Sequence, residues 1–143
     1  VEGRMLQALL IEPGDQVLEV GCGCGYITAC LASLAQHVTS IDTRDELVEF
    51  ARGNVDNCGL TNVDFAATGL SQVSDNLAYD VIAVTGSLAA VPENLLQALN
   101  VGGRMFVIVG QSPVMEALLI TRVGESEWTT QSLFETDLPR LGG

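Results

Sequence analysis

The chain has 143 residues, enough for one domain that buries roughly 70% of the surface its unfolded chain would expose. Apolar residues make up 48% of the sequence, and no run approaches the roughly 18 apolar residues of a membrane helix, so we expect a soluble cytoplasmic domain without a membrane partner. Eighteen acidic residues outnumber six basic ones, and the net charge of −12 argues against a nucleic-acid partner because it repels a polyanion.

Hydrophobic periodicity predicts strands that alternate with helices along the chain. The expected strands span residues 17–20, 38–41, 63–67, 81–84, 105–109, 117–123 and 128–135. The expected helices span residues 5–10, 27–34, 47–58 and 95–99, with Gly59 ending the third and Pro92 in the first turn of the fourth. The chain enters its first helix directly and without a starting methionine, so we expect a single domain, residues 1–143, taken from a longer protein.

Strands and helices at this spacing predict an α/β fold with a mostly parallel sheet of seven strands, covered by helices on both faces. The last two strands flank Gly124-Glu125-Ser126, which predicts a C-terminal antiparallel hairpin. An α/β sheet that ends in such a hairpin is typical of the Rossmann-like methyltransferases.

The glycine-rich segment after the first strand is the strongest functional motif. Glycines at Gly21, Gly23 and Gly25 let the backbone turn tightly and approach a ligand near the start of a helix. A dinucleotide loop would have its third glycine where Tyr26 stands. With Glu19 before the first glycine, the pattern is that of loops that hold the methionine part of S-adenosylmethionine, whose positive groups favour a carboxylate. The alternative is a purely structural turn between strand and helix.

Two further segments extend the predicted site at the ends of strands. Asp42 ends the second strand, where its carboxylate can accept hydrogen bonds from both ribose hydroxyls. The alternative role for Asp42 is to cap the next helix. We expect Thr43 to be the N-cap of that helix while Asp42 faces the ligand. Thr68 and Gly69 follow the third strand, where such folds contact adenine, and a threonine hydroxyl bonds with less charge assistance than an aspartate. The alternative, to which we give equal weight, is that Thr68 and Gly69 are ordinary loop residues.

Four cysteines and one histidine, His37, do not have the paired spacing of a zinc site. We therefore predict no metal, reduced and packed thiols, and a histidine that packs at the start of a strand. Four serines lack a nearby base and are not nucleophile candidates: Ser71, Ser74, Ser87 and Ser112. No catalytic residue is assigned.

Seven segments in succession resemble motifs of the bacterial protein-L-isoaspartate O-methyltransferases. They are residues 17–26, 79–85, 92–99, 101–104, 109–110, 118–122 and 133–135, and the similarity continues to Leu141. The resemblance implies S-adenosylmethionine as cofactor and isoaspartyl residues of proteins as substrate, methylated on the α-carboxylate in protein repair. It also implies a set of cofactor-binding residues: Glu19, Gly21, Cys22, Gly23, Gly25, Asp42, Thr43, Thr68, Gly69 and Thr85.

The sequence departs from this family at Thr68, where an aspartate is common, and no match to the family's N-terminal region precedes Met5. Two alternatives therefore stay open: a small-molecule methyltransferase, and a cofactor-binding module without turnover. A nucleic-acid base methyltransferase would need an Asn- or Asp-Pro-Pro-aromatic segment where Val84-Thr85-Gly86-Ser87 stands. The oligomeric state stays undetermined.

Overall fold

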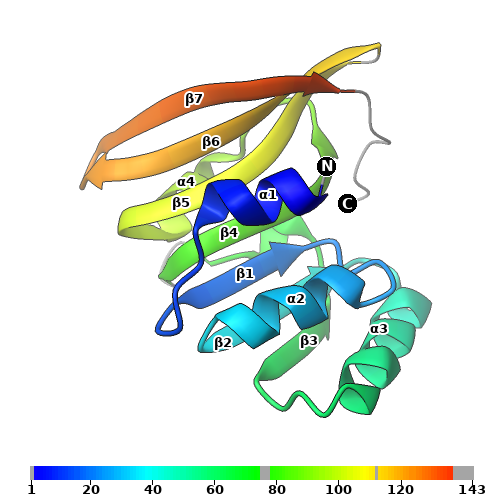
Figure 1. Ribbon diagram of the computed structural model, residues 1–143. Coiled ribbons are helices and arrows are strands. Elements are labelled where there is room, and N and C mark those ends of the chain that lie inside the picture. Colours follow the sequence, from blue (N-terminus) through cyan, green and yellow to red (C-terminus); the bar gives the residue numbers. More distant parts are fainter. Residues whose placement is uncertain (1, 75–77, 112, 137–143) are drawn as a thin grey trace.

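Residues 2–74, 78–111 and 113–136 are described by the computed structural model, in which seven strands form one mixed sheet (Figure 1). Ser112 and Leu141 lie outside the described residues. The strands are β1 (Gln16–Val20), β2 (His37–Asp42), β3 (Val63–Ala67), β4 (Tyr79–Leu88), β5 (Leu99–Gln111), β6 (Val114–Gly124) and β7 (Glu127–Thr136). The helices are α1 (Glu2–Leu9), α2 (Tyr26–Leu34), α3 (Asp45–Asn57) and α4 (Glu93–Ala98), with a 3-10 turn at Leu70–Gln72.

The five strands from β3 to β5 are parallel to one another, and β6 and β7 add two antiparallel pairs. Its order is β3-β2-β1-β4-β5-β6-β7, and the parallel pairs run from β3 through to β5. The pairs β5–β6 and β6–β7 are antiparallel. In the hairpin of β6 and β7 the last paired residues before the turn are Gly124 and Glu127. The predicted fold class and C-terminal hairpin are therefore confirmed.

The strand order reverses between β1 and β4, and this reversal positions the site. From β1 the chain proceeds outward to β2 and β3, and then crosses to β4 on the other side of β1. Where two neighbouring parallel strands continue in opposite directions, the loops at their carboxyl ends separate and leave a crevice. The glycine loop follows β1 at this point.

Helices cover both faces of the sheet, with α1, α2 and α3 on one face and α4 on the other (Figure 1). On the first face Met5 and Leu9 of α1 and Leu31 of α2 are buried in one apolar cluster. On the second face Leu95 and Ala98 of α4 belong to another cluster that includes strand residues of β1, β4 and β5. These two clusters pack the helices against the strands whose carboxyl ends carry the loops of the candidate site.

The segment around α4 differs from the prediction. Pro92 is the N-cap residue rather than part of the first turn, and the helix ends at Ala98. Leu99, expected in the helix, begins β5 and pairs with Tyr79 of β4. Leu99 is buried, and the backbone pairing of a buried strand outweighed the helical spacing of its neighbours.

The cysteine side chains are free thiols, but only part of the packing prediction is confirmed. Cys22 is buried and Cys30 partly buried, whereas Cys24 and Cys58 are exposed. His37 begins β2 as predicted, and its Nε2 lies 3.1 Å from Asp64. Within the described part of the chain no three potential metal ligands gather together. No helix there is long and apolar enough to cross a membrane.

Candidate functional site

The loop after β1 turns on glycines that adopt left-handed backbone conformations. The φ angles of Gly21, Gly23 and Gly25 are +97°, +51° and +90°. A side chain at such angles is strained, so the alternating glycines satisfy a backbone requirement. The N–H of Gly21 donates to the carbonyl of Ile41 at 2.7 Å, which ties the loop to the end of β2.

Two of these glycines face different surroundings. A Cβ at Gly25 would lie 2.9 Å from the carbonyl oxygen of Ala51, so this glycine allows the start of α2 to pack closely on α3. A Cβ at Gly23 would meet no atom of the described structure within 4 Å. Gly25 therefore has a packing function, whereas Gly23 faces open space.

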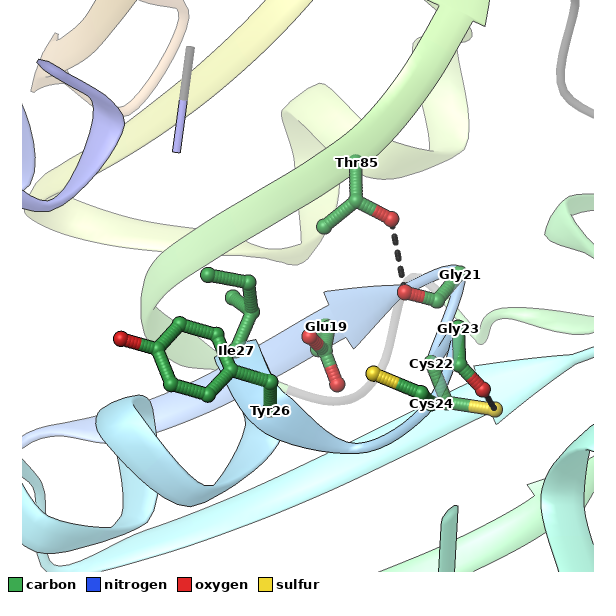
Figure 2. A pocket seen from close by; sticks show the side chains of 8 residues that line it. All are labelled: Glu19, Gly21, Cys22, Gly23, Cys24, Tyr26, Ile27 and Thr85. Atoms are coloured by element: carbon green, nitrogen blue, oxygen red, sulfur yellow. Dashed lines mark hydrogen bonds between the residues drawn. The ribbon is translucent and has the colours of Figure 1, made fainter. Parts of the chain in front are cut away.

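A pocket of about 230 Å³ lies between the glycine loop and β4 (Figure 2). Its lining consists of Glu19, Gly21, Cys22, Gly23, Cys24, Tyr26, Ile27 and Thr85. The hydroxyl of Thr85 donates to the carbonyl of Gly21 at 2.6 Å, the contact drawn as a dashed line in Figure 2. This bond fixes the loop against β4 across the point where the strand order reverses.

Glu19 of β1 lines this pocket, and its two carboxylate oxygens have unequal surroundings. Oε1 accepts hydrogen bonds from the hydroxyls of Thr28 and of Ser40, the latter at 2.7 Å. Oε2 is buried and finds no hydrogen-bond partner within the described residues. Burial raises the pKa of Glu19 to about 7, although the bonds from Thr28 and Ser40 act in the opposite direction. A cation or donor that enters the pocket would therefore meet an unsatisfied buried acceptor.

Cys22 takes part in the site through its backbone rather than through a reactive thiol. Its N–H donates to Oδ2 of Asp42 at 3.2 Å. Burial, together with the negative charges of Asp42 and Glu19, raises the pKa of its thiol to about 11. The thiol therefore stays protonated at neutral pH.

A second, smaller pocket of about 10 Å³ adjoins the first at Gly21. It is lined by Val20, Gly21, Ile41, Asp42, Thr43, Thr68, Gly69 and Leu70. Nine of the ten residues predicted to bind the cofactor thus line one pocket or the other, and Gly25 is the exception. The segments predicted to contact ribose and adenine meet at the edge of the sheet where β2 and β3 end.

Asp42 is buried, and Arg44 holds its carboxylate. The guanidinium donates from Nε to Oδ1 at 2.9 Å and from Nη2 to Oδ2 at 3.0 Å. The backbone N–H of Arg44 donates to Oδ1 as well, at 3.1 Å. Burial pushes the pKa of Asp42 upward, but the hydrogen bonds and charge of Arg44 outweigh it, so the pKa lies below its usual value.

The prediction that Thr43 caps α3 is wrong. The N-cap residue is Arg44, and its own side chain makes no capping hydrogen bond among the described residues. The Asp42 carboxylate accepts the N–H of Arg44 and forms a local turn, so the helix begins one residue later than the sequence motif indicates.

Several residues of this region are not indicated by the sequence motifs. Tyr26, Ile27 and Cys24 line the larger pocket, and all three flank the glycine loop, which was a usable signal. Arg44 follows Asp42 by two positions, which is the spacing at which an aspartate side chain accepts a backbone N–H in a local turn. The contacts of its guanidinium depend on a side-chain rotamer that the sequence does not specify.

Comparison with known proteins identifies the family. Residues 1–136 match the sequence model of the protein-L-isoaspartate(D-aspartate) O-methyltransferases. A protein-L-isoaspartate O-methyltransferase of Roseobacter denitrificans is 40% identical over 126 residues, which cover 87% of this chain and 59% of that protein. Protein-L-isoaspartate O-methyltransferase 2 of Pelobacter propionicus is 36% identical over 131 residues, which cover 90% of this chain and 58% of that protein. The chain therefore spans less than two thirds of the length of these relatives.

Two solved structures share the fold. One protein-L-isoaspartate O-methyltransferase superposes with a TM-score of 0.88 at 28% identity, over 99% of this chain and 46% of that chain. The other is a Plasmodium falciparum protein described as a protein-L-isoaspartate O-methyltransferase and crystallised with S-adenosyl-L-homocysteine. It superposes with a TM-score of 0.81 at 22% identity, over 98% of this chain and 70% of that chain. The chain belongs to the protein-L-isoaspartate(D-aspartate) O-methyltransferase family.

Proposed function

We propose that this chain binds S-adenosylmethionine across the two adjoining pockets and is the cofactor-binding domain of a protein-L-isoaspartate O-methyltransferase. The observation that carries the proposal is the unsatisfied Oε2 of buried Glu19 beside the glycine loop. A buried acceptor without a partner is costly, and the ammonium group of the methionine part would satisfy it. Solved relatives of the same fold, one of them holding S-adenosyl-L-homocysteine, support this ligand.

The residues present fit the three parts of this cofactor. Glu19 would neutralise the ammonium group, and the open space at Gly23 would admit the methionine chain. Asp42 would accept hydrogen bonds from the ribose hydroxyls, and Thr68 with Gly69 would border the adenine. The bound cofactor would supply a methyl group on an electron-poor sulfur.

The methyl acceptor we propose is the α-carboxylate of an isoaspartyl residue in a damaged protein. A carboxylate is already ionised at neutral pH, so the chain need not supply a general base. Its contribution is to hold the acceptor oxygen in line with the methyl group and to exclude water, which is worth roughly 7–11 kcal/mol in favourable cases. The names of its relatives support this substrate class. Free thiols throughout are consistent with a cytoplasmic location.

A methyl-transfer assay with paired peptides tests the proposal. The chain would be incubated with cofactor labelled on the methyl group and a peptide that contains one isoaspartyl residue, with the aspartyl peptide of the same sequence as control. We expect base-labile label on the isoaspartyl peptide alone. Equal labelling of both peptides would contradict the substrate assignment. Saturable cofactor binding without labelling of either peptide would favour a binding module without turnover.

A further inference from the structure

The hydrogen-bond acceptors of Asp42 are fully used by the protein itself. A carboxylate offers about four lone-pair positions, two on each oxygen. Oδ1 accepts the backbone N–H and the Nε of Arg44, at 3.1 Å and 2.9 Å. Oδ2 accepts the N–H of Cys22 and the Nη2 of Arg44, at 3.2 Å and 3.0 Å, and the thiol of Cys22, a weak donor, lies 3.8 Å from the same oxygen. No position is left for a ribose hydroxyl while all four bonds are made.

The four nitrogen donors are of two kinds, and only one kind can leave easily. The N–H groups of Cys22 and Arg44 belong to the backbone of the glycine loop and of the start of α3, so they remain when a ligand enters. The guanidinium belongs to a side chain that is 54% exposed, whereas the carboxylate it contacts is 2% exposed. Removing the guanidinium would free one lone-pair position on each oxygen of Asp42.

One free position on each oxygen is what two neighbouring hydroxyls of a ribose require. We propose that the guanidinium of Arg44 occupies the place of the cofactor's ribose diol and must move into solvent before the nucleoside can bind, so that Arg44 sets the affinity of the site. This inference rests on the proposed cofactor function. The two backbone N–H groups keep the carboxylate oriented after the guanidinium has left, so the site does not depend on Arg44 for its shape.

Isothermal titration of the whole chain with S-adenosylhomocysteine tests this inference through Arg44→Ala. The variant should bind about three- to fivefold more tightly than the parent, because a half-exposed ion pair no longer has to be broken. Arg44→Lys should lie between the two, since an ammonium cannot contact both oxygens in the same fork. Arg52→Ala is the matched control, because Arg52 lies in α3, the helix that Arg44 precedes, and its guanidinium contacts exposed Glu49, at 3.6 Å, and the Phe65 ring, neither of which lines either of the two pockets.

Salt provides an independent readout of the same contact. Raising sodium chloride from about 20 mM to about 300 mM screens the exposed side of the Arg44–Asp42 pair. The ratio of the dissociation constants of parent and Arg44→Ala should therefore fall towards one, whereas the ratio of parent to Arg52→Ala should stay constant.

The outcomes separate this inference from the proposed function. Binding by the parent that is unchanged or weakened in Arg44→Ala would overturn the competition and make Arg44 a positioning residue for Asp42. A ratio that does not change with salt would also count against it. Absence of binding in the parent and in every variant would overturn the proposed cofactor function, and the competition with it.

Discussion

Glu19 is a buried carboxyl group whose proton depends on what enters the pocket beside it. Thr28 of α2 and Ser40 of β2 both donate to Oε1, and nothing in the described structure donates to Oε2. Two hydroxyl donors on one oxygen do not offset the cost of burying the charge, so the pKa is raised to about 7. The place of Glu19 beside the glycine loop, where it lines the larger pocket, was predictable from its position before the first glycine. Its protonation was not, because the donors come from separate elements.

The raised pKa of Glu19 predicts that stability falls as pH rises. Glu19 is protonated in both folded and unfolded chains well below pH 4.5, and the folded chain holds its proton up to about pH 7. The unfolding free energy should therefore decrease between these values, by about 3 kcal/mol from this group, and stay level above them. Urea unfolding of the parent and of Glu19→Gln at pH 5 and pH 8 measures it. A pH-dependent loss of the same size in the glutamine variant would contradict the assignment.

Affinity for S-adenosylhomocysteine should change with pH in the opposite direction. The ligand's ammonium group requires an ionised Glu19, so binding below pH 7 must first remove the proton held by the folded chain. We expect the dissociation constant to rise about tenfold from pH 8 to pH 6. Titration calorimetry at both values gives the ratio. A Glu19→Gln variant should bind weakly and nearly independently of pH, and an equal pH dependence would assign the effect to another group.

The contact between α2 and α3 depends on the absence of a side chain at Gly25. Its φ is +90°, and a Cβ would lie 2.9 Å from the carbonyl oxygen of Ala51, which as backbone cannot move aside easily. We expect Gly25→Ala to lower the unfolding free energy by about 2–4 kcal/mol. Gly53 of α3 is the matched control, because a Cβ there meets nothing within 4 Å among the described atoms. Gly53→Ala should raise stability by about 0.5–1 kcal/mol.

Chemical denaturation of both variants measures the difference. Equal effects of the two substitutions would mean that the loop and α3 move apart at no cost, and the close packing at the start of α2 would then be unimportant for the fold.

At the level of elements, the interiors of strands and helices were predictable and several ends were not. Buried apolar runs such as residues 81–84 predicted the strands, because strands buried on both faces are apolar throughout. Leu99 was assigned to a helix, although its pairing with Tyr79 makes it the first residue of β5. Thr43 was assigned as a cap, although the carboxylate of Asp42 takes the N–H concerned. For Leu99 a pairing partner distant in sequence decided where the strand begins. For Thr43 the neighbouring carboxylate of Asp42 decided where the helix begins.

For the whole molecule, the order of the strands brings the parts of the site together. Glu19 is the penultimate residue of β1, Asp42 is the last residue of neighbouring β2, and Thr85 comes from β4 on the other side of β1. The carboxyl ends of these parallel strands share one edge of the sheet, so the alternation of strands and helices was enough to predict that the residues meet. The saturation of Asp42 by Arg44 was beyond prediction, because it depends on where a long and flexible side chain comes to rest.

Titration of the parent chain and of Asp42→Ala with S-adenosylhomocysteine would measure whether the glycine loop and the end of β2 form one cofactor site. We expect saturable binding to the parent at one site per chain, weakened at least about tenfold in the variant through loss of two charge-assisted hydrogen bonds. Asp64→Ala, on the exposed side chain that contacts His37, should bind as the parent does. No binding to the parent, or equal binding to the parent and to Asp42→Ala, would contradict a shared cofactor site.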